Sequence, residues 1–316
     1  MNKAWMREII VKFTSKKIKK QITFGDKDVN LSINVSGVKH MSTLKETCTI
    51  KITNLTYSQI ISLIAGEYYD VEVFAGYRNG NVPMMFKGGV LYISDELQSD
   101  RSHVAIILCT SSIVAKYSQK RINLSLNSGV NIYSALKFLC ERAQIPNANI
   151  NTSLKQKILT EITSVNDTPA NYINKLMNIN DTFVVDSDET TGNTFSIYDY
   201  NYNKRVVNIS VDMIDFTGGP PRLTSSGLSI TIMPTINLRC GDIIKIDNSL
   251  LNISASTIQE ARQYTANYLD KEGKYMVYQI EYQFENRGSG FSLSLECKTL
   301  SLFQNIVGGW YDRKPR

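Results

Sequence analysis

Two histidines are the first residues to consider, because imidazole serves both metal binding and acid–base catalysis. They are His40 and His103, and each lies in or beside an alternating, strand-like segment. Neither has a Glu or Cys at the spacing that a His-based zinc site requires. A Ser–His hydrolase would have to use one of these two residues, and we expect that neither is catalytic.

Carboxylate pairs are the second possibility, since glycoside hydrolysis needs only two of them at a defined separation. Three acidic clusters lie in or near predicted turns: Asp95 and Glu96; Asp186, Asp188 and Glu189; Asp212 and Asp215. Acidic residues in turns commonly cap backbone amides. The stretch "DSDETTGN" lacks the sixth-position Gly and the twelfth-position Glu of a calcium loop. We therefore predict no catalytic residue, no metal site and no cofactor.

Sequence motifs for nucleotide chemistry are also missing. The sequence contains no GxxxxGK[ST], GxSxG or HExxH pattern, and "RGSGF" is predicted to be a hairpin turn because no helix follows it. The chain has 35 Lys and Arg against 29 Asp and Glu, a net charge of +6. Its densest basic runs are Lys16, Lys17, Lys19 and Lys20, and Arg313, Lys314 and Arg316. Neither run alternates with aromatic residues, so a nucleic-acid groove is the least favoured function.

Cysteine usage indicates a reducing compartment. The five cysteines are an odd number, scattered and without a CxxC pair: Cys48, Cys109, Cys140, Cys240 and Cys297. We expect synthesis in a host cytoplasm with buried, unpaired thiols. No segment has the length and hydrophobicity of a signal peptide or a membrane span, so we expect no membrane anchor.

The elements that must position any site are mostly strands in the first third. Residues 1–117 contain alternating segments such as "VNLSINVSG", "CTIKITNL", "YDVEVFAGY" and "MMFKGGVLYIS". "HVAIILCTS" is apolar on both faces and is predicted to be a central strand. One short helix is expected after Thr56, which can cap it, with Gly66 as its end.

Residues 118–216 have the pattern of a small α/β module. One helix is predicted from an apolar stripe that consists of Ile132, Ala135, Leu136, Leu139 and Ala143. A second begins with Asp167 and Thr168 as its cap and Pro169 at its first position, and its apolar stripe lists as Tyr172, Ile173, Leu176 and Met177. A hairpin is expected around Gly192.

Strands return after "FTGGPPR", which marks a predicted domain boundary before residues 217–316. A helical excursion is expected at about 256–272, because Thr257 and Glu260 have capping-box spacing; its rough stripe lists as Ile258, Ala261, Thr265, Tyr268 and Leu269. A long hairpin follows. The side chains predicted to form its buried face are Met276, Tyr278, Ile280, Tyr282, Phe284, Phe291, Leu293, Leu295 and Cys297. The motif apolar-x-Cys ends a hairpin in both the first and the last third, which suggests a duplication.

The phrases "VEVFAGY", "MMFKGGVLYIS" and "LRCGDIIKI…GKYMVYQIEYQFENRGSGFSLSLECKT", in this order, resemble the baseplate hub proteins of contractile-tailed phages, including the Mu-like hub family. This resemblance implies a mainly β fold with two tube-like β-barrel domains, at 1–117 and 217–316, flanking the α/β module. It implies a structural virion protein of the tail baseplate, not an enzyme. Three copies would form a ring that adapts the sixfold tail tube to the threefold central spike.

The implied partners are the tail tube, central spike, baseplate wedge and tape measure proteins, with DNA only in transit through the lumen. Some relatives carry a fused peptidoglycan-cleaving domain, for which we expect no room before Arg316. At the basic tail, Trp310, Tyr311 and Arg313 form a candidate protein interface, although Trp310 and Tyr311 are equally compatible with folding back onto their own domain. Two alternatives stay open: a distal tail or tube-initiator protein of a long flexible-tailed phage, and a tail-associated cell-wall hydrolase or glycan-binding module.

Overall fold

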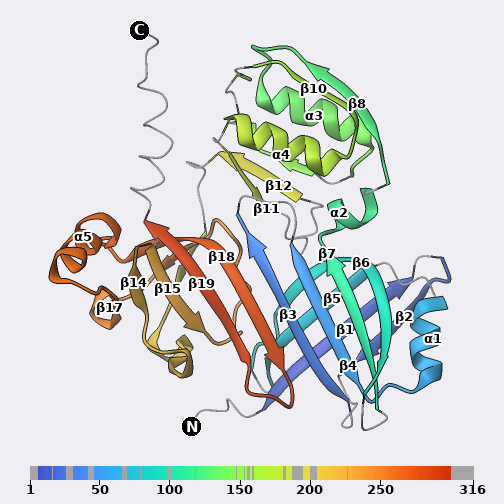
Figure 1. The fold of residues 1–316 in the computed structure, drawn as a ribbon, viewed down its shortest axis with the longest axis horizontal. Helices are drawn as coiled ribbons and strands as arrows, with labels where there is room; N and C mark the ends of the chain where they lie inside the picture. Colours follow the sequence, from blue (N-terminus) through green and yellow to red (C-terminus); the bar gives the residue numbers. More distant parts are fainter. Residues whose placement is uncertain are drawn as a thin grey trace.

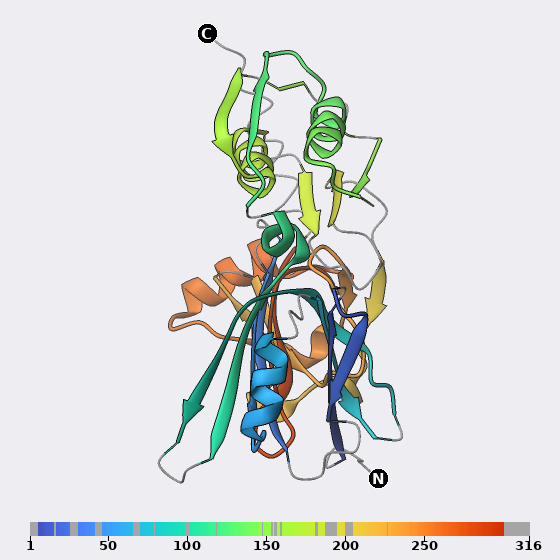
Figure 2. The same cartoon turned by 90° about the vertical axis from the view of Figure 1, so that its right-hand side faces the viewer.

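The computed structural model describes residues 6–299, except positions 16, 26–30, 42–45, 66–69, 79, 99–101, 118, 147, 153, 155–156, 159, 181–182, 187–194, 200–204 and 226. Fourteen of the described strands join into one mixed sheet. A smaller α/β module lies at one end of this sheet (Figures 1 and 2). The mainly β fold with an α/β insertion is therefore confirmed.

The first β region contributes one half of the sheet. Its elements are β1 (Arg7–Ser15), β2 (Lys20–Phe24), β3 (Ser32–His40), β4 (Thr47–Thr53), α1 (Tyr57–Ala65), β5 (Asp70–Tyr77), β6 (Met84–Leu97) and β7 (His103–Thr110). β7 is central, between β4 and β6, as its two apolar faces predict. Helix α1 begins as expected, with the Gln59 amide donating to Thr56 Oγ1 at 3.3 Å. The predicted end at Gly66 lies outside the described residues.

The middle module follows α2 (Ser112–Tyr117) and has its own core. Its elements are β8 (Ile122–Leu126), α3 (Ile132–Ala143), β9 (Ala148–Ile150), β10 (Ile162–Asp167), α4 (Pro169–Asn180), β11 (Phe183–Asp186) and β12 (Phe195–Asp199). The predicted stripes of both helices are buried, although the Met177 side chain is not described. β11 and β12 form the expected hairpin, and β9 joins β12 in parallel.

The last β region completes the sheet. Its elements are β13 (Val206–Asn208), η2 (Val211–Met213), η3 (Phe216–Gly218), β14 (Arg222–Thr224), β15 (Gly227–Ile232), β16 (Ile243–Lys245), η4 (Asn248–Leu250), β17 (Asn252–Ile253), α5 (Ile258–Tyr268), β18 (Lys274–Glu285) and β19 (Phe291–Thr299). Its first strand, β13, precedes the predicted boundary at position 217. The long predicted hairpin is β18–β19. Helix α5 is capped by Thr257 Oγ1, which accepts from the Glu260 amide at 3.1 Å.

The strand order does not confirm the expectation of two tube-like β-barrel domains. Within the described residues the order is β17-β14-β15-β19-β18-β3-β4-β7-β6-β5-β1-β2, with β16 pairing to β18 and β13 to β16. β3 belongs to the first region and β18 to the last, and these two strands pair directly over seven residues. The two regions also share one hydrophobic core, to which Phe13, Phe86, Tyr275 and Phe284 all belong. No pairing among the described strands closes either half into a separate barrel.

Two details of the predicted faces are wrong. A bulge in β18 between Val277 and Gln279 shifts the register, so the predicted alternation holds from Ile280 onward but Tyr278 is only half-buried. In α5, Ile258 is 77% exposed and no described side chain is fully buried; the half-buried face instead contains Ala261, Tyr264 and Tyr268. The first error arises because the bulge changes the face that Tyr278 occupies.

No helix in the described ranges combines the length and the hydrophobicity needed to cross a membrane.

Candidate functional site: a continuous polar sheet face

Side chains of one polar face run across the sheet from the last β region into the first. The register places directly opposed residues in rows, and one such row is Ser292, Gln283, Ser36, Thr49, Leu108 and Tyr92. Directly opposed side chains in antiparallel strands point to the same face. The row therefore crosses β19, β18, β3, β4, β7 and β6 without a break. We call the face of the sheet that carries this row the polar wall.

The polar wall carries a shallow groove where the two β regions meet. The groove has a volume of about 400 Å³ and is lined by Ser36, Val38, Thr49, Glu281, Gln283 and Ser294, among others. Glu281 and Gln283 are exposed, and the Gln283 amide donates to Glu285 Oε1 at 2.9 Å. Hydroxyl, amide and carboxylate groups on an open surface favour contact with water. Nothing in this groove has the enclosed, mostly apolar lining of a small-molecule pocket.

Strands β3 and β18 are locked together by a tyrosine that passes over a glycine. Tyr282 stands directly opposite Gly37, and its hydroxyl donates to the Thr47 carbonyl of β4 at 3.3 Å. A Cβ atom at Gly37 would lie 2.3 Å from both the Tyr282 hydroxyl and the Thr47 carbonyl oxygen. Only glycine leaves room for this crossing. Burial raises the pKa of the Tyr282 phenol well above its usual range, so the hydroxyl remains a donor.

The turn of the β18–β19 hairpin is clipped to two strands of the first region. Asn286 Oδ1 accepts from the Ile33 amide at 2.9 Å, and its Nδ2 donates to the Leu31 carbonyl at 3.1 Å. From β1, Arg7 Nη1 donates to the Gly288 carbonyl at 2.6 Å, and its guanidinium lies 5.2 Å from the ring centre of Phe291. The side chain of one asparagine and one arginine therefore fix the hairpin across the shared core.

The two histidines do not come together. His40 is at the end of β3, where its ring centre lies 4.5 Å from that of Tyr278, and Lys298 Nζ lies 3.7 Å from the same Tyr278 ring centre. Burial, and then the charge of Lys298, lower the pKa of His40, against an opposing effect of Glu296. His103 instead contacts Asp95, with Nδ1 at 3.0 Å from Oδ2. Neither environment supplies an aligned nucleophile.

Among the described residues, the acidic clusters do not form a catalytic pair. Asp95 and Glu96 lie within the last three residues of β6, next to its connection to β7, which agrees with the prediction that they lie in or near a turn. Asp215 caps η3, accepting from the Thr217 amide at 3.0 Å. The side chains of the third cluster, Asp186, Asp188 and Glu189, lie outside the described residues. In the described part of the chain, no group of three or more His, Cys, Asp or Glu residues could hold a metal ion.

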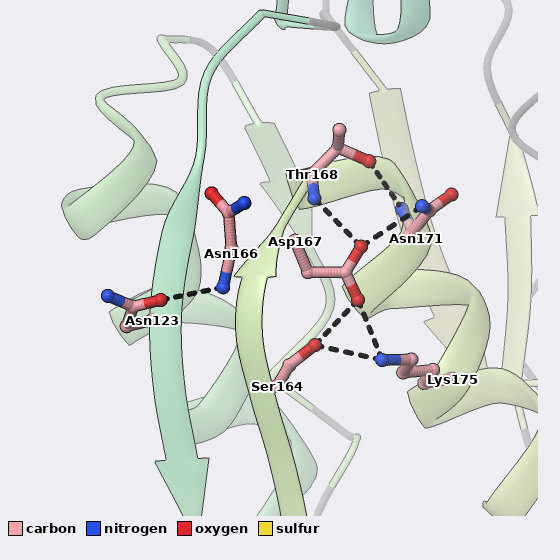
Figure 3. A network of polar contacts seen from close by, with 7 residues as sticks. All are labelled: Asn123, Ser164, Asn166, Asp167, Thr168, Asn171 and Lys175. Atoms are coloured by element: carbon pink, nitrogen blue, oxygen red, sulfur yellow. Dashed lines mark hydrogen bonds and ion pairs between the residues drawn. The ribbon is translucent and has the colours of Figure 1, made fainter.

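A Ser–Lys–Asp cluster at the start of α4 has the residue types of catalysis but the contacts of a helix cap (Figure 3). Asp167 Oδ2 accepts from Ser164 Oγ at 2.6 Å and lies 2.7 Å from Lys175 Nζ. Its Oδ1 accepts from the Thr168 amide at 2.9 Å and from Asn171 Nδ2 at 3.0 Å. Partial burial opposes ionisation, but these hydrogen bonds outweigh it and hold the pKa of Asp167 well below its usual range. The predicted cap is confirmed.

All five cysteines are free and buried. Burial raises the pKa of Cys48 and of Cys140 to about 12, so both stay protonated thiols at neutral pH. The expectation of small apolar cysteines is confirmed.

Sequence reasoning missed the residues that join the two β regions, namely Gly37, Tyr282, Asn286 and Arg7. A glycine in the middle of an alternating strand was the one available signal, because it marks a close approach of another group. The proposed interface residues Trp310, Tyr311 and Arg313 lie outside the described residues.

No protein-family model matches the chain, and no curated protein matches it in sequence. Solved structures do match its fold. The 43 kDa tail protein of prophage MuSo2 from Shewanella oneidensis has a TM-score of 0.54 and 9% identity, over 94% of this chain and 98% of that one. The tail protein from Neisseria meningitidis MC58 has a TM-score of 0.54 and 10% identity, over 93% of this chain and 96% of that one.

A third match is an E. coli component of the type VI secretion system, described as structurally similar to the bacteriophage T4 tail proteins gp27 and gp5. Its TM-score is 0.54 with 10% identity, over 86% of this chain and 75% of that one. Identities this low establish the fold and nothing finer. The chain therefore has the fold of phage tail proteins, which confirms at the level of the fold the resemblance in its strand phrases.

Proposed function

We propose that the chain is a structural hub protein of a phage tail baseplate and not an enzyme. Three copies form a ring, and the two β regions of each copy present six similar units to the sixfold tail tube. The other side of the ring is threefold and accepts the central spike. This proposal includes the division into residues 1–117, 118–216 and 217–316, with the two β regions acting as tube-like half-barrels within the ring. The fold shared with tail proteins supports it.

The observation that carries the proposal is the direct pairing of β3 with β18. It gives one chain a single wall with one polar face, where two independent domains would leave a mobile joint. A wall of this kind suits a ring whose channel must stay open while cargo passes. Obligate interfaces between such copies typically bury about 2,000 Å² or more.

The composition of the polar wall supports passage of DNA without retention. Glu281, Glu285 and Glu296 belong to the polar rows of β18 and β19, and they outnumber Lys298 of β19 and Lys51 of β4 on the same face. Carboxylates repel phosphate groups, so DNA and the tape measure protein would pass in transit and not bind. No cofactor is part of this function. The protein would reside in the virion, at the tail baseplate, after synthesis in the host cytoplasm.

The test is native mass spectrometry of the purified protein, alone and with its spike and tube proteins. Trimers are the expected species. Monomers alone in all mixtures would contradict the hub, and a hexamer would favour the distal tail protein of a long flexible-tailed phage. Clearing of peptidoglycan in a zymogram, or specific glycan binding, would instead favour the cell-wall module.

The C-terminal tail supplies a second contact in this proposal. Trp310, Tyr311 and Arg313 follow two glycines and offer large contact area with a cation. We expect replacement of both aromatic residues by Ala to weaken recruitment of spike, tube or wedge protein in a pull-down. Unchanged recruitment would remove the tail from the interface and leave the ring itself untouched.

A further inference from the structure

Exposed apolar side chains gather on two opposite sides of the molecule, which we call its two ends. At one end, β6 exposes Leu91, Tyr92 and Leu97, with exposed fractions of 54%, 58% and 66%. At the other end, Ile253 of β17 and Ile258 of α5 are 46% and 77% exposed. Figure 1 places β6 and α1 on the right of the molecule and β17 and α5 on the left. Apolar surface that gathers in this way marks contact sites.

The first of these ends has an unpaired strand edge. β5 pairs with β6 only from Met84 to Gly89, so among the described strands the stretch Val90–Leu97 pairs with β7 alone. One edge of this stretch therefore presents backbone donors and acceptors beside exposed apolar side chains. Proteins usually protect such edges, because they attract another strand.

Helix α1 carries further exposed apolar side chains, and Figure 1 draws it on the same side of the molecule as β6. Tyr57, Ile61 and Ile64 are exposed and recur at helical spacing, on a face next to that of the buried Ile60 and Leu63. The helix contains no charged residue. Tyr57 approaches the neighbouring hairpin, with its ring centre 6.1 Å from that of His103 on β7. We call the surface made by α1 and Val90–Leu97 the α1–β6 end.

The opposite surface, made by α5, β17 and β14, is called the α5–β17 end. Helix α5 packs against β14 and β17 but buries no described side chain completely. Tyr264 and Tyr268 pack against the shared core, while most other side chains of the helix are exposed. Two exposed arginines, Arg222 of β14 and Arg262 of α5, lie at this end, and neither forms an ion pair among the described residues. The α1–β6 end carries the exposed carboxylate of Glu96, so the charges of the two ends are complementary.

We propose that the α1–β6 end of one copy docks on the α5–β17 end of the next copy. The inference rests on the proposed ring and names the surfaces that build it. A contact between two different surfaces of the same chain is heterologous, and it closes into a ring when its rotation fits. A second copy as the occupant explains both apolar ends through one interface. A foreign partner would explain only one of them.

The test uses cysteine pairs and a flexible bis-maleimide on the full chain. Leu97→Cys marks one end and Ile258→Cys marks the other; the five native thiols are buried and remain silent. Each variant alone should give no cross-linked species, because like ends do not meet. A mixture of the two should give covalent dimers, and the double variant should give a closed trimer. Val165→Cys, at a 75% exposed position of the middle module, mixed with Ile258→Cys is the control and should give none.

Charge insertion gives an independent measurement. Leu97→Asp and Ile258→Asp should each raise the dissociation constant of the ring by roughly tenfold or more, while Val165→Asp should leave it unchanged. Melting temperatures check that each variant is folded. Rings by native mass spectrometry without cross-links above the Val165→Cys control would overturn this interface and leave the hub standing. Monomers of the unmodified protein in every mixture would overturn both.

Discussion

Asp167 caps the first turn of α4 and also pairs with a lysine. Its carboxylate accepts hydrogen bonds from the Thr168 amide, from Asn171 and from the Lys175 ammonium. Four donors converge on its carboxylate, and the side chain is 13% exposed. Such a cap stabilises the start of a helix by about 0.5–2 kcal/mol. The carboxylate is therefore a stability element of the middle module, although its neighbours Ser164 and Lys175 have the residue types of a hydrolase.

Replacing this carboxylate should change the acid stability of the module. The pKa of Asp167 is depressed in the folded chain, against about 3.9 when unfolded. Its contribution is therefore complete above the unfolded value and is lost as the pH falls through the folded value. Asp167→Asn should cost about 1–2 kcal/mol at neutral pH and remove part of the stability loss in acid. Chemical denaturation at neutral and acidic pH, with amide exchange of α4, measures this. Equal acid slopes in both proteins would contradict it.

Gly37 is expected to be the least replaceable residue of β3. Gly37→Ala places a methyl group against the Tyr282 hydroxyl and the Thr47 carbonyl, and overpacking of this kind costs about 1–3 kcal/mol. Urea denaturation of the variant measures the loss of unfolding free energy. Ser36→Ala, one position away on the exposed polar face, is the matched control and should have little effect. Equal stability of the two variants would show that Tyr282 does not cross there.

Local signals explain which residues could be predicted. Thr56, Asp167 and Thr257 cap helices a few residues away, so their roles follow from spacing alone. Tyr282 and Gly37 are distant in the sequence, and only the pairing of their strands brings them together. The same distance hides Arg7 and Asn286. The alternating pattern predicted the strands and the polar face, but it contains no information on which strand lies beside which.

At the scale of elements, the β18–β19 hairpin is the part that joins the two β regions. Its strands form the alternation that the sequence predicts, and its turn is held by Asn286 and Arg7. The alternation could not predict the bulge at Tyr278, because Met276, Tyr278 and Ile280 continue the apolar pattern through it. The sequence therefore predicts the two strands of the hairpin, but it does not predict that β18 pairs with β3.

Asn286→Ala should loosen this hairpin from β3. The variant leaves the Ile33 amide without its acceptor and the Leu31 carbonyl without its donor, at a cost of about 1–3 kcal/mol. Hydrogen exchange should accelerate at Ile33 and along β3, while β15 and β19 keep their protection. Ser289→Ala serves as the control, since the backbone carbonyl and not the side chain of Ser289 accepts from Arg7. Unchanged exchange at Ile33 would rule out the clip.

At the scale of the whole molecule, one sheet and one core unite segments from the two ends of the chain, and the middle module lies beyond one end of the sheet (Figure 2). The order β, then α/β, then β follows from the sequence pattern. The union of the outer parts does not, because strand pairing over such a distance depends on three-dimensional closeness alone. This union makes a continuous polar wall, and the wall is the basis of the ring that we propose.

Electron microscopy of the purified protein, with the symmetry of its rings counted in averaged top views, tests this most directly. We expect threefold rings around an open channel. Each copy should contribute an uninterrupted arc of the ring with two similar lobes of density, one for each β region. Rings of six copies that each contribute a single unit, or particles in which the two β regions of one chain separate, would contradict the proposed hub.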